Sequence, residues 1–276
     1  MIIDGRKISQ QILQSIQERI QHLSFKPVLC DIIVGDDKVS MSYVKIKQRV
    51  AEKCGLDFLL VNLPQTSKLS EVVDAIHKVQ EDKKLCGLIV QLPLPEHLNT
   101  KEILNAIDLK VDVDLLSEKS SEQFYTGSHN LIPPTAAAIW HILQDLKIDL
   151  TTKNILVIGQ GQLVGMPITY LLKSNGFNVN IATKDTDDIK ALTKNADIII
   201  SGAGKDKLLN GDMVKDGVIV IDAGTSEVDG GIAGDVDFQS VEPKAQFITP
   251  VPGGVGPVTV VKLIENVVTV AEEIVL

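Results

Sequence analysis

Two kinds of segment alternate along this chain: short runs of apolar and β-branched residues, and longer runs with helical periodicity. In the first part, residues 27–34, 56–63 and 86–92 are typical of buried strands, and residues 8–23, 40–54, 68–82 and 100–107 of helices. A predicted helix at 135–146 then precedes five further strands, at 154–158, 178–182, 198–201, 218–221 and 246–249. This alternation predicts parallel sheets with helices on both faces, because parallel strands need long crossover connections.

The polar, proline-containing stretch from residue 108 to 134 separates the two series and predicts an irregular domain boundary. We therefore expect an α/β fold of two domains with a cleft between them: an N-terminal αβα domain and a Rossmann-type dinucleotide-binding domain. The closing helix after Pro257 comes too late to belong to a compact second domain, so it is predicted to pack on the first. The expected domains are residues 1–130 plus 256–276 and residues 135–255.

The composition argues against several classes of protein. The 276 residues include 27 Lys and Arg against 36 Asp and Glu, a net charge of −9, which argues against binding to nucleic-acid phosphates. Three dispersed cysteines in apolar surroundings and five isolated histidines predict no metal site. The N-terminus lacks a signal-peptide pattern, and no apolar run approaches the roughly 18 residues of a membrane span. We therefore expect a soluble cytoplasmic protein without a membrane partner.

Residues 153–167, KNILVIGQGQLVGMP, combine a strand, a glycine-rich turn and the start of a helix. Gly159, Gly161 and Gly165 are close to the GxGxxG spacing, with one additional residue before the last glycine. Gly159 allows the tight turn, Gly161 allows a pyrophosphate to approach, and the helix N-terminus supplies free N–H donors. The pattern predicts nucleotide binding; a plain tight turn between strand and helix is the alternative.

The next predicted strand ends close to Lys184 and Asp185, where a Rossmann domain meets the ribose of its dinucleotide. A carboxylate at this position is typical of NAD sites, and basic groups are typical of NADP sites. Because both types are present, these residues leave the cofactor open between NAD and NADP.

Three further groups of polar residues are candidates for a site. Tyr43 and Lys47 lie four residues apart on one face of a predicted helix, where a solvated lysine beside a half-buried tyrosine is the ordinary alternative. Gln91 interrupts an apolar strand near its carboxyl end, where open α/β sheets bind ligands, but a hydrogen-bonded core amide fits equally. Asp112 and Asp114 alternate along an extended segment, and solvent-facing carboxylates fit that pattern as well as a site does.

Residues 248–259, ITPVPGGVGPVT, place three prolines and three glycines between a predicted strand and a predicted helix. Such residues continue neither element, so a shaped loop is expected. The string resembles the characteristic loop of the methylenetetrahydrofolate dehydrogenase/cyclohydrolase family. Further motifs of that family occur in the same order: YVxxK at 43–47, VQLPLP at 90–95, the second Asp of DVDG at 114, GxxxxVGxP at 159–167, GDMV at 211–214 and GDVDF at 234–238.

The resemblance extends over nearly the whole chain and implies a bifunctional enzyme of one-carbon metabolism and purine biosynthesis. It implies oxidation of 5,10-methylenetetrahydrofolate with NADP, or with NAD as the alternative, and hydrolysis of the methenyl product to 10-formyltetrahydrofolate. The N-terminal αβα domain would be catalytic, and the protein a homodimer through its nucleotide domain. Lys47 would be the catalytic lysine, with Gln91 as its hydrogen-bonded partner. Tyr43 would lie against the aminobenzoyl ring of the folate, and Asp114 would accept the pterin N–H groups.

The resemblance also implies the remaining ligand contacts. Substrate contacts are implied for Tyr43, Gln91, Leu92, Pro93, Asp114, Pro252, Gly253, Gly254 and Pro257. Dinucleotide contacts are implied for Gly159, Gln160, Gly161, Gln162, Val164, Gly165, Thr183, Lys184, Gly202 and Thr225.

Four motifs depart from the family pattern. Leu115 replaces the glycine of DVDG, and Ala136 ends the counterpart of PCTP. Gln160 and Gly161 replace the Arg and Ser of GRS, and Asp185 stands where a basic residue is common, so NAD stays open beside NADP. The first two departures keep a catalytically weakened or monofunctional folate- and dinucleotide-binding member of the fold as an alternative. A two-domain dehydrogenase of another small substrate, as in shikimate-type enzymes, is the other alternative.

Overall fold

The structure, a computed structural model, describes residues 1–228 and 231–275, and the chain forms two compact units. The five-stranded unit consists of residues 1–10 and 135–259. The three-stranded unit consists of residues 11–134 and those from 260 on. Two helices, α1 (Gly5–Ile20) and α10 (Val255–Val275), each begin in the first of these units and end in the second.

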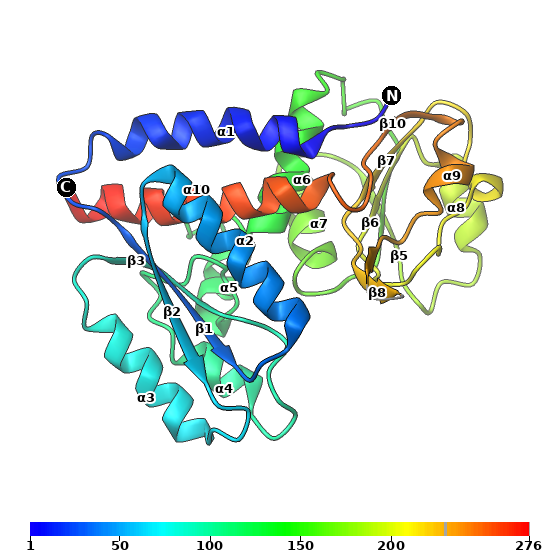
Figure 1. The fold of residues 1–276 in the computed structure, drawn as a ribbon. Coiled ribbons are helices and arrows are strands. Elements are labelled where there is room, and N and C mark those ends of the chain that lie inside the picture. Colours follow the sequence, from blue (N-terminus) through cyan, green and yellow to red (C-terminus); the bar gives the residue numbers. More distant parts are fainter. Residues whose placement is uncertain (229–230, 276) are drawn as a thin grey trace. The chain divides into compact units, whose positions relative to one another are not determined.

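The three-stranded unit holds a fully parallel sheet of strand order β2-β1-β3 (Figure 1). Its strands and helices, in chain order, are β1 (Val28–Val34), α2 (Lys38–Cys54), β2 (Asp57–Leu63), α3 (Leu69–Gln80), β3 (Leu85–Val90), α4 (Thr100–Asn105) and α5 (Glu118–Tyr125). Gly55 ends α2 in the left-handed region, with a φ of 98°, as its position in the sequence predicts.

The two faces of β1 pack against different helices, because successive side chains of a strand point to opposite faces. Cys30 and Ile32 join a core cluster with Val72 and Ile76 of α3. Asp31 points to the other face, where it meets α2. This central strand therefore connects the apolar core to the helix that carries the candidate lysine.

We expected the stretch 108–134 to be irregular. The structure differs from this expectation, because α5 lies within the stretch. The Ser117 side chain caps this helix by accepting the backbone N–H of Ser120. Its buried residues are Ser120 and Phe124, so the helix carries too little apolar periodicity for the pattern to indicate it.

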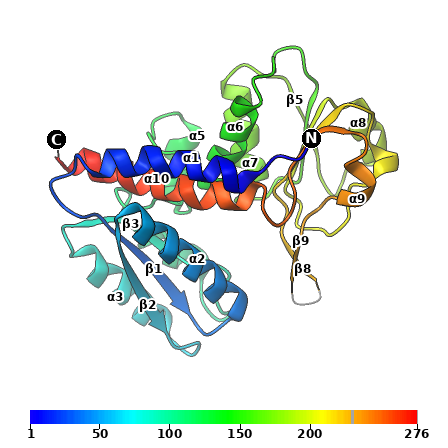
Figure 2. The same cartoon turned by 45° about the horizontal axis from the view of Figure 1, so that its top comes forward.

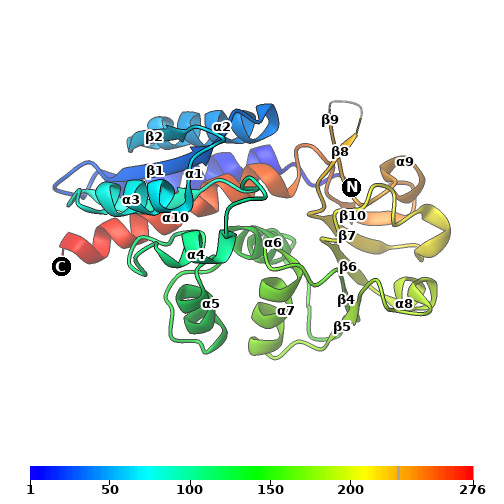
Figure 3. The same cartoon turned by 90° about the horizontal axis from the view of Figure 1, so that it is seen from below.

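The five-stranded unit holds a parallel sheet of strand order β10-β7-β6-β4-β5 (Figure 3). Each strand matches its predicted range to within one residue: β4 (Ile155–Ile158), β5 (Val179–Ala182), β6 (Ile198–Ser201), β7 (Val218–Asp222) and β10 (Ala245–Ile248). The helical elements are α6 (Pro134–Asp145), α7 (Gly165–Ser174), α8 (Ile189–Asn195), η1 (Gly211–Met213) and α9 (Phe238–Val241).

Two features of this unit are absent from the sequence-based prediction. The N-terminal residues extend the sheet beyond β10, since Ile2 pairs with Ile248 and the Ile3 N–H donates to the Ile248 carbonyl at 2.8 Å. The strands β8 (Ser226–Val228) and β9 (Gly231–Ala233) pair antiparallel (Figure 2). Each of these segments is too short to show a strand period.

The 21 residues of α10 make it the longest element described. Its part in the three-stranded unit buries Val261, Ile264, Val267, Val268 and Ala271, which recur at helical spacing. Within residues 1–228 and 231–275, no helix combines the length and apolar character that crossing a membrane requires.

A substitution at Gly87 on β3 tests how tightly α10 packs on the sheet. A Cβ at this position would lie 2.7 Å from Val267 Cγ2 and 3.1 Å from both Leu29 Cδ1 and Val113 Cγ2. Gly87→Ala should therefore lower the free energy of unfolding by about 1–3 kcal/mol through overpacking, measured by urea denaturation. Gly256→Ala is the matched control, because a Cβ there meets no atom within 4 Å. Equal stability of the two variants would contradict the packing described.

Candidate active site

Lys47 and Gln91 form the centre of the candidate site in the three-stranded unit. Lys47 projects from the middle of α2 and is 8% exposed. Its Nζ donates to Gln91 Oε1 at 2.8 Å, and Gln91 Nε2 donates to the Leu92 carbonyl at 2.7 Å. The Gln91 N–H also donates to the carbonyl of Ile32, which fixes Gln91 directly after β3. The lysine is therefore not solvated, as its ordinary alternative would have it, whereas the hydrogen-bonded amide of Gln91 is compatible with either of its two readings.

Asp31 also contacts this lysine and is not among the candidates expected from the sequence. Its Oδ2 is 2.6 Å from Lys47 Nζ, and its side chain is fully buried. Burial raises the pKa of the Asp31 carboxyl, and the positive charge of Lys47 opposes that rise. The available signal was one acidic residue in the otherwise apolar strand VLCDIIV.

Asp112 and Asp114 have different structural roles, although they belong to one motif. Asp112 is buried and clamps a turn, because its two carboxylate oxygens accept the backbone N–H groups of Leu116 and Ser117. Asp114 is partly exposed. Leu115 directly follows Asp114 and precedes the two residues that Asp112 binds. Its φ is 56°, in the left-handed region, which a glycine adopts at less cost. The turn of the family motif is thus kept with a strained leucine.

Two of the candidate residues in this unit have shifted acidity. Burial raises the pKa of Asp114 to about 6, the charge of Lys47 opposes the rise, and the charges of Asp112 and Asp31 add to it. Burial also raises the pKa of Tyr43, which is half-buried on α2. Asp114, Asp31 and Lys47 are therefore close enough to influence one another electrostatically.

Asn266 of α10 holds the backbone on either side of this region and was not foreseen. Its Nδ2 donates to the carbonyls of Val113 and Ile132, both at 2.9 Å, and the residue is 8% exposed. These two carbonyls belong to the irregular connections around α5, which have few regular hydrogen bonds of their own. The position of Asp114 therefore depends on a side chain about 150 residues further along the chain.

In the five-stranded unit, close contacts leave no room for a side chain at three glycines of the candidate nucleotide site. A Cβ on Gly159 would lie 2.7 Å from the Gly202 carbonyl oxygen, and one on Gly165 would lie 2.0 Å from the Gly159 carbonyl oxygen. A Cβ on Gly202 would lie 2.5 Å from Val164 Cγ1. Gly159 has in addition a φ of 86°. Gly159 and Gly165 shape the turn between β4 and α7, and Gly202 lets Val164 of that turn lie close to the end of β6.

Gly161 differs from its neighbours, because a Cβ there meets nothing within 4 Å. Gly161 and Gln162 are exposed and lie in the turn that leads into α7. The N-cap residue of this helix, Val164, has no hydrogen-bonding side chain. Gln160 folds back onto the loop, donating to the Gly159 carbonyl and to Thr169 Oγ1. Open space beside an uncapped helix N-terminus fits the pyrophosphate of a dinucleotide.

The loop after β5 presents both candidate selectivity residues to solvent. Lys184 and Asp185 are exposed, and the loop is fixed by the Thr183 N–H, which donates to Thr186 Oγ1 at 2.9 Å. The opposite charges thus remain available to a ligand at the end of β5, where a dinucleotide ribose lies in this type of fold.

Two buried aspartates hold the loops that contain Gly202 and Thr225. Asp235 accepts hydrogen bonds from Ser201 Oγ and from the backbone of Ala203 and Lys205, all at 2.7 Å. Asp222 accepts the N–H groups of Gly224, Asp235 and Val236. Burial raises the pKa of Asp222 to about 6, and those backbone donors oppose the rise. The aspartates of the GDVDF and IDAG segments therefore have a scaffolding role.

The proline- and glycine-rich loop is formed by close backbone contacts. A Cβ on Gly254 would lie 2.6 Å from the Pro250 carbonyl oxygen, and one on Gly5 would lie 1.7 Å from the Gly254 carbonyl oxygen. Gly253 has a φ of 111° and accepts the Gly5 N–H at its carbonyl. The Val251–Pro252 peptide bond of this loop is cis, as is Leu92–Pro93 in the other unit. Pro252, Gly253, Gly254 and Pro257 thus share the five-stranded unit with the nucleotide loop.

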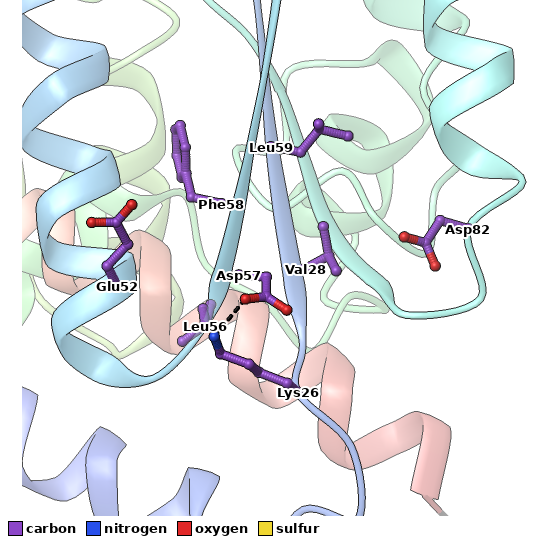
Figure 4. Close-up of a pocket in the computed structure, with 8 residues that line it drawn as sticks. All are labelled: Lys26, Val28, Glu52, Leu56, Asp57, Phe58, Leu59 and Asp82. Carbon is purple, nitrogen blue, oxygen red and sulfur yellow. Dashed lines mark hydrogen bonds and ion pairs between the residues drawn. The ribbon is translucent and has the colours of Figure 1, made fainter.

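A separate hollow lies at the N-terminal ends of the strands of the three-stranded unit, whereas Gln91 follows the C-terminal end of β3. It borders the first residues of β1 and β2, where Lys26 pairs with Asp57, and Phe58 and Leu59 line it (Figure 4). Lys47 and Gln91 do not line it, so it is not the candidate site. The described residues contain no cluster of three or more His, Cys, Asp or Glu side chains arranged for a metal ion.

Comparisons with known proteins agree with both units. The family model "Tetrahydrofolate dehydrogenase/cyclohydrolase, catalytic domain" matches residues 3–114, and that of the family's NAD(P)-binding domain matches residues 133–275. The bifunctional protein FolD of Nautilia profundicola is 40% identical over 275 residues, which cover 98% of this chain and 97% of that protein.

Solved structures agree as well. The bifunctional FolD methylenetetrahydrofolate dehydrogenase/cyclohydrolase of Campylobacter jejuni has a TM-score of 0.94 and 36% identity, and 99% of each chain is covered. The Trypanosoma brucei methylenetetrahydrofolate dehydrogenase-cyclohydrolase, complexed with NADP cofactor and an inhibitor, has a TM-score of 0.94 and 32% identity. That match covers 100% of this chain and 98% of the other.

Two units with parallel sheets, one matching a catalytic domain and the other an NAD(P)-binding domain, define a two-domain dinucleotide-dependent enzyme of the α/β class. Given the matches over most of its length, the chain belongs to the tetrahydrofolate dehydrogenase/cyclohydrolase family. The predicted two-domain α/β fold and the predicted dehydrogenase and cyclohydrolase activity are confirmed at this level. The cofactor is a nicotinamide dinucleotide, for which residues 133–275 form the binding domain.

A substitution at Gly161 can separate an effect on dinucleotide binding from an effect on the stability of the fold. Gly161→Asp should leave the melting temperature nearly unchanged, since a Cβ at this exposed position has free space in the protein. It should raise the KM for the dinucleotide on the order of tenfold, because the carboxylate would repel the pyrophosphate expected beside it. Gly165→Ala is the contrasting variant, and it should lower the melting temperature, because its Cβ meets the Gly159 carbonyl oxygen. A normal KM in Gly161→Asp would mean that the dinucleotide lies elsewhere.

Proposed function

We propose that Lys47, Gln91, Tyr43 and Asp114 form the folate site of this dehydrogenase/cyclohydrolase, and that Gly159–Gly165 and the loops after β5, β6 and β7 hold the dinucleotide. The observation that carries the proposal is the buried Lys47 ammonium, held 2.8 Å from Gln91 Oε1. A buried lysine, fixed by an amide that directly follows a strand, is suited to reaction chemistry.

The proposed reaction has two steps. A hydride leaves the one-carbon bridge of 5,10-methylenetetrahydrofolate, which becomes the methenyl cation. Water then adds to that carbon, a proton is released, and the bond to N5 breaks to give 10-formyltetrahydrofolate. The nicotinamide dinucleotide supplies the hydride acceptor, and the chain positions the reactants, on which such a transfer mainly depends.

Each polar residue of the folate site suits one part of this chemistry. In its neutral amine form, Lys47 can bind the water that attacks the methenyl carbon and accept the proton that this water loses, with Gln91 fixing the direction of the nitrogen. Asp114, as a carboxylate, is an acceptor for the adjacent N–H groups of a pterin, and such a pair is charge-assisted. The half-buried Tyr43 ring offers an apolar face to the aminobenzoyl group, and Leu92 and Pro93 are proposed as further substrate contacts.

We propose NADP as the preferred dinucleotide, with NAD as the alternative. Support comes from the exposed Lys184 after β5, which can meet a ribose phosphate, and from the Trypanosoma brucei relative, which was solved with NADP. Asp185 and the inward-turned Gln160 favour the alternative. We also propose that Pro252, Gly253, Gly254 and Pro257 contact the substrate, and that the protein is a cytoplasmic homodimer through its nucleotide domain, as the family resemblance implies.

A catalytically weakened member of the family is the second candidate, and Leu115 favours it. A positive φ at a buried leucine costs about 1–2 kcal/mol, and it directly follows the proposed pterin-binding carboxylate. The retained Lys47–Gln91 bond speaks against this candidate. The family match over both units speaks against a dehydrogenase of another small substrate.

The first test is formation of reduced nicotinamide from 5,10-methylenetetrahydrofolate, with hydrolysis of supplied methenyltetrahydrofolate followed in parallel. We expect both activities in the unchanged protein. Lys47→Met should lower the hydrolysis rate by about 10²–10⁴-fold, the range of general acid–base catalysis. Its Kd for the dinucleotide should not change, because those residues belong to the other unit. Undiminished hydrolysis in this variant, assayed well below its melting temperature, would refute the role of Lys47.

Cofactor preference is tested by a matched pair of variants. Lys184→Gln should reduce kcat/KM for NADP by about tenfold and leave that for NAD nearly unchanged, because it removes the charge that would meet the ribose phosphate. Asp185→Asn should improve kcat/KM for NADP by removing a repulsive carboxylate. Both values come from initial rates with each dinucleotide. If Lys184→Gln affected NAD and NADP equally, the proposed contact would be wrong.

A further inference from the structure

Asp31 is a buried carboxylate that the proposed mechanism does not use. It is the one charged residue of β1, VLCDIIV, and its side chain is 0% exposed. A charge in such apolar surroundings is strongly unfavourable unless an opposite charge lies beside it. Packing alone therefore disfavours this residue.

The opposite charge belongs to Lys47. Asp31 Oδ2 lies 2.6 Å from Lys47 Nζ, and the same nitrogen donates to Gln91 Oε1 at 2.8 Å. Neither carboxylate oxygen of Asp31 accepts a well-aligned hydrogen bond from the part of the chain that the structure describes, so the ion pair is its compensation. An ammonium group has three N–H donors, so these contacts leave capacity for a further partner.

Both anchors of the lysine are fixed on one sheet. Asp31 lies opposite Ile89 in the pairing of β1 with β3, and the Gln91 N–H donates to the Ile32 carbonyl of β1. Lys47 itself approaches from α2 on a flexible four-carbon stem. A buried carboxylate and an amide on adjacent, hydrogen-bonded strands restrict where its nitrogen can lie.

We propose that Asp31 is a positioning residue for Lys47: its buried carboxylate fixes the ammonium nitrogen beside Gln91, in the orientation that serves water attack on the methenyl carbon. Asp31 acts through Lys47 and does not itself touch substrate. The inference rests on the proposed cyclohydrolase function of Lys47. It also explains how a charged residue is kept inside a core strand.

Asp31→Asn tests the catalytic part of this inference, because asparagine keeps the shape and removes the charge. We expect kcat for methenyltetrahydrofolate hydrolysis to fall on the order of 10²-fold, with KM for the folate and for the dinucleotide little changed. Ile33→Val is the matched control on the same face of β1, and it should leave kcat unchanged. An unchanged kcat in Asp31→Asn, or an equal loss in Ile33→Val, would overturn the proposal.

Melting temperatures test the coupling independently of activity and of how well Asp31→Asn folds. Lys47→Met leaves the Asp31 charge buried without compensation, so it should melt well below the unchanged protein. The double variant Asp31→Asn/Lys47→Met removes that charge and should melt higher than Lys47→Met alone. If the double variant melts at the same temperature as Lys47→Met or lower, Asp31 is not coupled to Lys47 and the proposal fails.

These measurements separate the two levels of inference. If the unchanged protein does not hydrolyse methenyltetrahydrofolate, the proposed function fails, and the proposed catalytic role of Asp31 fails with it. If the unchanged protein and Asp31→Asn hydrolyse it equally fast, the function stands and the positioning role of Asp31 is wrong.

Discussion

Direct contact of backbone with backbone, with no Cβ between, is the constraint on which the candidate sites depend. Gly165 lies against the Gly159 carbonyl, and Gly254 against that of Pro250, closer than any side chain allows. These contacts determine where the first turn of α7 and the start of α10 lie. Because a protein interior is close-packed, shifting one such contact displaces the next. The ligand loops are therefore rigid products of packing.

Electrostatics has the corresponding role in the three-stranded unit. Charges and polar groups there sit in a largely apolar setting: Lys47 between Asp31 and Gln91, and Asp112 on two backbone N–H groups. Each is tolerated because a partner offsets its loss of hydration. The same compensation fixes geometry, so the side chains that could react are also the ones with the least freedom to move.

The fold could be predicted from the sequence far better than the interactions in the site. The apolar runs indicate all the parallel strands, but α5 has only Ser120 and Phe124 buried and gives no periodic signal. Gly161 and Gly165 look equivalent in the sequence, yet one faces open space and the other touches backbone. Asp31 was hidden because a run such as VLCDIIV predicts a buried strand, and pairing to Lys47 across 16 residues depends on the tertiary fold. The roles of Lys47, Gln91, Tyr43 and Asp114 came from resemblance and remain predictions.

The division of α10 between the units has a consequence for the order of folding during synthesis. All the residues of the five-stranded unit have been added by residue 259, whereas the three-stranded unit still lacks Asn266 and the apolar face of α10. Domains usually fold in the order in which they leave the ribosome. Here the unit that holds most of the first half of the chain is the last that can become complete. The face of its sheet around Leu29 and Gly87, against which Val267 of α10 packs, stays open until that helix has been synthesised.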